Sequence, residues 1–96
     1  MKAYIVINAR VVDHDLLEAY RAGARATIAK HGGVVLAGSN DATVLDGEPA
    51  GQRVVVVEFP SREVATAWCD DPEYQSAKAL RRRATAGVAL LVDGRS

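Results

Sequence analysis

The sequence has a single cysteine, Cys69, and no surplus of charge of either sign. One cysteine excludes a disulfide framework within the chain and is compatible with a reducing compartment. Lysine and arginine total 12, as do aspartate and glutamate, so no basic footprint for nucleic acid or an anionic membrane is present. We therefore expect neither nucleic acid nor membrane as a partner.

Long apolar runs and catalytic signatures are also missing from the sequence. No run approaches the roughly 20 apolar residues that cross a bilayer, and the first residues lack the layout of a signal peptide. Neither a metal-ligand cluster, nor a phosphate loop, nor a nucleophile elbow is recognisable. The sequence therefore predicts a soluble cytoplasmic protein that needs no metal or other cofactor.

A chain of 96 residues is expected to form one domain over residues 1–96 with a limited hydrophobic core. Such a small domain is only modestly stable alone. Burial of a further apolar surface against a partner subunit would compensate for the small core.

The first third of the chain predicts a strand followed by a helix. Residues 3–11 are rich in β-branched side chains, and every second residue from Ala3 is apolar. Asp13 is placed to cap a helix, which Gly32 and Gly33 then end. Steps of three and four residues predict one buried helical stripe, made of Leu16, Leu17, Tyr20, Ala24, Thr27, Ile28 and His31.

The rest of the chain predicts three further strand regions and a broken helix. Residues 34–37 are apolar, residues 38–41 interrupt them and residues 43–45 resume strand character, which indicates a bulged strand or two strand pieces around a loop. Residues 46–51 form a turn before a strand over Arg53–Phe59. Ser61 is predicted to cap a helix that buries Val64, Ala65 and Trp68. Asp71, followed by Pro72, is predicted to cap a second helical piece that runs to about Ala84. Residues 87–92 form the last predicted strand.

The resulting order, β-α-β-β-α-β, is the α+β ferredoxin-like unit, in which a four-stranded antiparallel sheet carries both helices on one face. The central strand offers Val54 and Val56 to one face and Val55, Val57 and Phe59 to the other. A lone two-layer domain would expose one of these apolar faces, and such a patch usually marks an interface. We therefore predict a homodimer with sheets face to face and a pocket between sheet and helices or at the sheet–sheet junction.

Short segments spread along the chain form a recognisable set: Ala3-Tyr4-Ile5-Val6, Tyr20-Arg21, His31-Gly32-Gly33, Leu36-Ala37-Gly38, Val57-Glu58-Phe59-Pro60-Ser61, Ala67-Trp68, Asp71-Pro72-Glu73-Tyr74-Gln75 and Arg81-Arg82. In these segments the chain resembles the domain-of-unknown-function 1330 family within the dimeric α/β-barrel superfamily. The resemblance covers nearly the whole chain and implies a ferredoxin-like fold and a dimer, but no established activity. One departure is Cys69-Asp70-Asp71, where the family more often has an aromatic residue, a small polar residue and serine before the proline.

Two titratable residues are candidates for catalysis. His31 is a candidate general acid or base, because an imidazole titrates near neutral pH; the alternative is a helix-end histidine that interacts with terminal carbonyls. Glu58 interrupts an apolar strand, where desolvation would raise its pKa into the range useful for proton transfer. The alternatives for Glu58 are an ion pair with Arg10 or Arg53, or a strand end that reaches solvent.

Four further residues are candidates for substrate binding. Asn8 and Arg10 end the first strand and could line a polar mouth, where Arg10 would bind a carboxylate or enolate oxygen. Tyr74 could line the same polar mouth of an apolar pocket, with His31 and Glu58, and Trp68 could contact a ligand, although the helical spacing of Trp68 and Tyr74 also indicates packing.

Two hypotheses about function follow from these candidates. The first is a cofactor-independent enzyme that acts on a small apolar or aromatic metabolite by proton transfer, as a cyclase, isomerase or monooxygenase. It rests partly on fold analogy. The second is a non-catalytic dimer that binds a small ligand or assembles with a partner.

Overall fold

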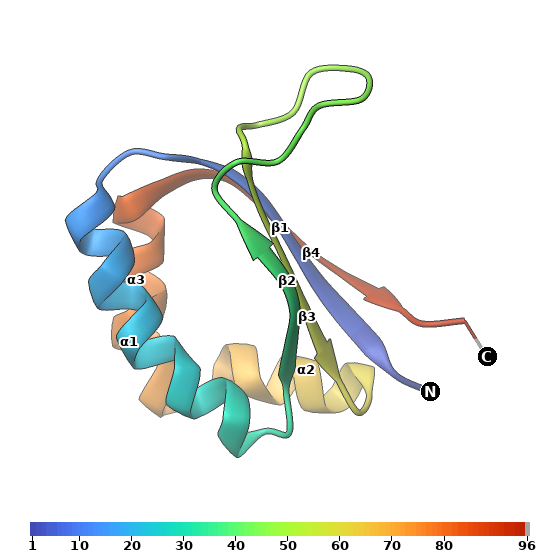
Figure 1. The fold of residues 1–96 in the computed structure, drawn as a ribbon. Helices are drawn as coiled ribbons and strands as arrows, with labels where there is room; N and C mark the ends of the chain where they lie inside the picture. Colours follow the sequence, from blue (N-terminus) through green and yellow to red (C-terminus); the bar gives the residue numbers. More distant parts are fainter. Residues whose placement is uncertain (96) are drawn as a thin grey trace.

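In the computed structural model, residues 1–95 are described and follow the predicted order of strands and helices (Figure 1). The second predicted helix consists of two helical pieces joined by a short 3-10 turn. The elements are β1 (Ala3–Val11), α1 (His14–Lys30), β2 (Val34–Ser39), β3 (Arg53–Phe59), α2 (Arg62–Asp70), η1 (Pro72–Tyr74), α3 (Gln75–Ala84) and β4 (Thr85–Asp93).

The four strands form one antiparallel sheet in the order β2-β3-β1-β4. The register places Ile5 opposite Val57 of β3 and Leu91 of β4. All the helices lie on one side of this sheet, as Figure 1 shows. The predicted ferredoxin-like arrangement is therefore confirmed.

The hydrophobic core lies between the helices and the helix-facing side of the sheet. Alternate residues of β1 and β3 point into it because successive side chains of a strand face opposite ways. Three aromatic rings stack at its centre: the Trp68 and Tyr74 centroids are 4.2 Å apart, and those of Phe59 and Trp68 are 5.4 Å apart. The largest fully buried side chains are Trp68, Tyr74, Phe59, Leu17 and Val57.

The helix ends lie where the capping residues predict them. Asp13 Oδ1 accepts a hydrogen bond from the Leu16 amide at 3.0 Å, and Ser61 Oγ accepts one from Val64 at 3.1 Å. Asp71 caps η1 in the same way. Gly32 follows α1 with φ +71°, a conformation that glycine adopts without penalty.

The segment over residues 40–52 differs from the prediction, because residues 43–45 form no strand. The facing half of this loop contains Gly47, Pro49 and Gly51, and proline has no N–H to donate to a strand ladder. Backbone groups of Ala50 and Gly51 bond instead to Asn8. The strand before the loop, β2, is continuous to Ser39, and its register shift lies between Val35 and Ala37 rather than at residues 38–41, where the bulge was expected.

The side of the sheet away from the helices is left uncovered in the single chain, and we call it the open face. Its apolar residues include Val88, Leu90 and Val92 of β4, which are exposed by 53%, 61% and 50%. By strand register, the open face comprises Tyr4, Val6, Asn8, Val54, Val56, Glu58, Val88, Leu90 and Val92. No helix within residues 1–95 is long and apolar enough to cross a membrane.

Candidate functional site: a pocket between the first helix and the sheet

A pocket of about 690 Å³ opens between α1 and the β2–β3 edge of the sheet. Figure 1 shows α1 opposite β2 and β3, on the side of the sheet that carries the helices. Apolar side chains form most of its wall: Ile7, Ala24, Ile28, Val35, Val55 and Val57. Pockets of roughly 300–1,000 Å³ with apolar walls and a few polar groups are typical of small-molecule sites.

Three arginines bring positive charge to this pocket: Arg21 and Arg25 from α1 and Arg53 from the start of β3. Arg21 pairs with Glu18 at 3.0 Å. Arg53 is half-buried and donates from Nη1 to Asn40 Oδ1 at 2.7 Å. Burial lowers the pKa of the Arg53 guanidinium, and the charge of Arg21 lowers it further.

A chain of hydrogen bonds reaches the pocket from the core. Tyr20 lines the pocket, and its hydroxyl lies 3.1 Å from the Tyr74 hydroxyl. Arg81 donates from Nη1 to the Tyr74 oxygen at 3.3 Å. Tyr74 is fully buried, and this burial raises the pKa of its phenol far above the ordinary value, so the group keeps its proton. The predicted site residue Tyr74 therefore lies behind Tyr20, rather than in the pocket wall.

Trp68 is the predicted site residue that the structure places in the pocket wall. Its Nε1 donates to Thr27 Oγ1 at 3.1 Å, and this hydroxyl donates to the Ala24 carbonyl at 2.9 Å. The indole is 1% exposed. The Trp68 indole therefore packs in the core and also lines the pocket.

His31 lies at the end of α1, where its side chain binds a carboxylate. Its Nε2 is 2.7 Å from Asp71 Oδ2, and Lys30 Nζ is 3.0 Å from the same oxygen. The His31 hydrogen bond, the Glu73 amide and Lys30 together hold the pKa of Asp71 well below its usual range. Asp71 was predicted only as a helix cap, because the sequence gives no sign that His31 is its neighbour.

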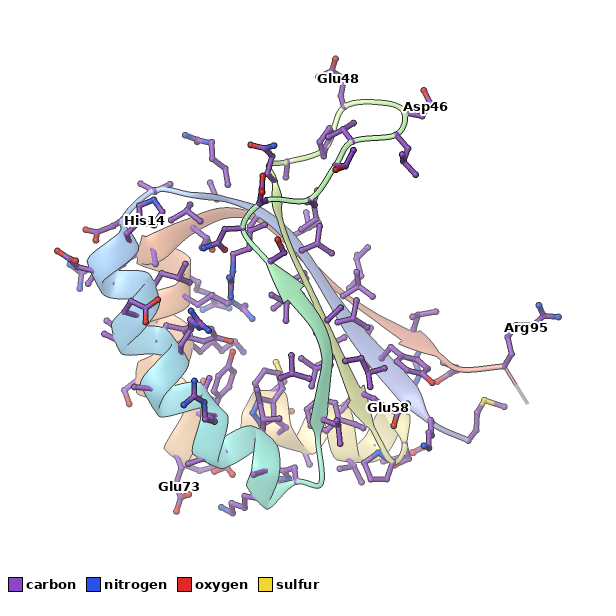
Figure 2. All side chains as sticks on the ribbon, in the orientation of Figure 1. His14, Asp46, Glu48, Glu58, Glu73 and Arg95 are labelled. Carbon is purple, nitrogen blue, oxygen red and sulfur yellow. The ribbon has the colours of Figure 1, made fainter. Side chains whose placement is uncertain are left out.

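Glu58 lies on the open face beside β1, away from α1 (Figure 2). Its carboxylate accepts hydrogen bonds from Lys2 and from Tyr4, both at 3.1 Å. The expected rise in pKa is wrong: the Lys2 hydrogen bond lowers the pKa of Glu58 and outweighs the effect of burial. The expected pairing with Arg10 or Arg53 is also wrong, because the register puts Tyr4 opposite Glu58 and those arginines at the other end of the strands.

The structure therefore does not bring His31 and Glu58 together. They bind different partners, and neither is among the residues that line the pocket within the described part of the chain. The geometry favours structural roles for both side chains: one joins the end of α1 to η1, and the other joins β3 to the start of β1.

Asn8 and Arg10 also lie outside the pocket lining of residues 1–95. The Asn8 amide holds the β2–β3 loop: Nδ2 donates to the carbonyls of Gly51 at 3.0 Å and Arg53 at 3.2 Å, and Oδ1 accepts from the Ala50 amide at 2.9 Å. Arg10 is exposed at the end of β1. Among the described residues, no group of three or more histidine, cysteine or acidic side chains is arranged to hold a metal ion.

The sequence prediction missed Arg53, Arg21 and Tyr20 as pocket residues. Arg53 was weighed only as a partner for Glu58, and Tyr20 only as a packing residue. The sequence does place Tyr20 on the buried stripe of α1. It does not show that a pocket separates this stripe from β2.

Comparisons with known proteins agree on family and fold. A family model described as "Domain of unknown function (DUF1330)" matches residues 2–95. Among curated proteins, none matches the chain.

Three solved structures show the same fold at low sequence identity. A protein of unknown function from Rhodopseudomonas palustris has a TM-score of 0.79 and 17% identity, over 99% of this chain and 83% of that one. SnoaB, a cofactor-independent oxygenase from Streptomyces nogalater, has a TM-score of 0.71 and 12% identity, over 99% and 94%. A dimeric protein of unknown function with a ferredoxin-like fold, from Bacteroides fragilis, has a TM-score of 0.64 and 12% identity, over 97% and 96%.

Proposed function

The chain belongs to the DUF1330 family, and we propose that it is a homodimer that binds a small, largely apolar molecule in the pocket between α1 and the sheet. The observation that carries this proposal is the pocket itself, whose volume of about 690 Å³ and apolar wall suit such a ligand. Tyr20 and Arg53 supply polar groups that would orient it.

The open face supports the homodimer. Val88, Leu90 and Val92 are at least half exposed there, beside Val6 and Val56 of the neighbouring strands. A contiguous apolar face of this kind usually marks an interface. A second copy is the occupant we propose, because the relative from Bacteroides fragilis, which has the same fold, is described as dimeric.

A second candidate function is cofactor-independent catalysis in the same pocket. SnoaB is described as a cofactor-independent oxygenase, and here Tyr20 lines an apolar pocket, where its hydroxyl could donate a proton or a hydrogen bond to a reacting oxygen. Catalysis by His31 or Glu58 stays a prediction and requires a ligand that reaches beyond the described pocket lining. Turnover of a bound ligand distinguishes this function from binding alone.

Ligand binding can be measured through Trp68, the only tryptophan of the chain, which lines the pocket. The probe is 4-methylumbelliferone, a two-ring phenol that absorbs where tryptophan emits. We expect saturable quenching of Trp68 fluorescence. The Ala29→Phe variant, which fills the pocket from α1, should weaken binding at least about tenfold, or 1.4 kcal/mol.

The matched control is Ala19→Phe, an exposed alanine of α1 that is not among the described pocket-lining residues. It should bind the probe like the wild type. Absence of saturable quenching, or equal weakening by both variants, contradicts the proposed pocket.

A further inference from the structure

We propose that the ligand of this pocket carries an anionic oxygen on its apolar body, and that Arg53 and the Tyr20 hydroxyl bind this oxygen. The inference rests on the proposed function, because it requires the pocket to be a ligand site. It adds the chemical class of the ligand and the two residues that recognise it.

The lining of the pocket is positively charged. Arg53 is half-buried, and its side-chain hydrogen bond goes to Asn40 Oδ1, a neutral acceptor. Within residues 1–95, no carboxylate lies at ion-pairing distance from Arg53, and no acidic side chain lines the pocket. A partly desolvated cation near a second arginine, Arg21, is stabilised by an anion that enters the pocket.

The direction of the hydrogen bonds that reach Tyr20 follows from which groups can donate and which can accept. Arg81 can only donate, so the Tyr74 oxygen accepts from it. Tyr74 is buried, and the acceptor available for its own hydroxyl hydrogen among the described residues is the Tyr20 oxygen, at 3.1 Å. Because buried hydroxyls are normally satisfied, Tyr74 donates to Tyr20.

This direction leaves the hydroxyl hydrogen of Tyr20 available to the pocket that Tyr20 lines. A hydroxyl whose oxygen already accepts a hydrogen bond is polarised and becomes a better donor. Arg53 and Tyr20 therefore offer a cation and an oriented donor in one pocket, which suits the single oxygen of a phenolate or an enolate. Tyr74 and Arg81 act as positioning residues, because they orient the hydroxyl without touching the ligand.

The test measures the pKa of a phenol bound in the pocket. An anion-binding site favours the ionised form, so the apparent pKa of bound 4-methylumbelliferone should fall about one unit below its value in water, a tenfold preference for the anion. Absorbance of the anion reports the titration. The neutral analogue 4-methylcoumarin, which lacks the hydroxyl, should bind at least about tenfold more weakly than the anionic probe.

Variants assign the effect to residues. Arg53→Met and Tyr20→Phe should each abolish most of the pKa shift, whereas Arg83→Met, at an exposed arginine of α3, should leave it unchanged. Tyr74→Phe should reduce the shift and leave the affinity for 4-methylcoumarin unchanged, which a merely structural defect would not do. Circular dichroism checks that each variant is folded.

The possible results separate the two proposals. A bound probe whose pKa is unshifted, or equally shifted in the wild type, Arg53→Met and Tyr20→Phe, overturns the anionic-oxygen inference and leaves the pocket as a ligand site. Failure of the wild type to bind either compound contradicts the proposed function and this inference together.

Discussion

His31 Nε2 lies 2.7 Å from Asp71 Oδ2, which joins the end of α1 to the turn between α2 and α3. Asp71 also caps that turn through the Glu73 amide at 2.8 Å, and Lys30 binds the same carboxylate. One buried carboxylate thus fixes two helical segments that are 40 residues apart in the sequence.

The Asp71→Asn variant should be less stable at neutral pH, although asparagine keeps a capping oxygen. Because the folded-state pKa of Asp71 lies below its unfolded value, its charge stabilises the fold above about pH 4, and this contribution is lost as pH falls further. In urea unfolding, the free energy of unfolding should be lower for Asp71→Asn than for the wild type at pH 7, and this difference should become smaller towards pH 3. The exposed neighbour provides the control, Asp70→Asn; an equal loss in both variants would refute a special role for Asp71.

Thr27→Val tests the buried hydrogen bond that holds Trp68. The substitution removes the acceptor of the indole N–H in a place closed to water, which should cost about 1–3 kcal/mol of unfolding free energy. Thr66→Val removes an exposed threonine hydroxyl that bonds to its own helix and should change stability by less than about 0.5 kcal/mol. Chemical denaturation measures the unfolding free energy of both variants. Equal losses of unfolding free energy would contradict a special role for the buried Thr27 hydroxyl.

Gly33→Ala tests the close approach of α1 to β3 beside Gly33, which lines the pocket. A methyl group there would lie 2.7 Å from both Ile28 Cγ2 and Phe59 Cε1. Overpacking of this kind costs about 1–3 kcal/mol. Gly38→Ala is the control, because its methyl group would meet its nearest neighbour, Val35 Cγ1, at 3.9 Å. A thermal melt that shows no difference between the two variants would mean that this contact relaxes freely.

Val56→Asp tests the proposed homodimer. The charge would lie on the open face of the central strand β3, and burying it against a second copy costs several kcal/mol, so the dimer should weaken at least about a hundredfold. Light scattering at matched concentrations measures the mass. Leu45→Asp, in the loop over residues 40–52 and 94% exposed, should remain dimeric. A folded Val56→Asp protein that stays dimeric would exclude the open face as the interface.

Local patterns predicted most of the fold. The period of two in β1 and β3 predicted the two faces of the sheet, and capping residues such as Asp13 and Ser61 predicted where helices begin. These signals act over a few residues, so they can be recognised without knowledge of the tertiary structure. The strand expected at residues 43–45 was wrong, because strand formation there depends on the facing Pro49 and on the remote Asn8.

The candidate site was harder to predict, because convergence in space has no local signal. His31 was chosen because an imidazole titrates near neutral pH, and Glu58 because it interrupts an apolar strand, yet their partners Asp71 and Lys2 are 40 and 56 residues away. Trp68 lies in the wall of the pocket, and its role in substrate binding remains a prediction. The expected homodimer and the cytoplasmic location remain predictions.

Ligand binding by the homodimer is tested most directly by a crystal structure of the protein grown in the presence of 4-methylumbelliferone. We expect two copies packed through their open faces, with the probe between α1 and β2 and its phenolate oxygen within hydrogen-bonding distance of Arg53 and Tyr20. A chain whose open face contacts only solvent, with the pocket closed by its own side chains and no probe bound, would contradict it.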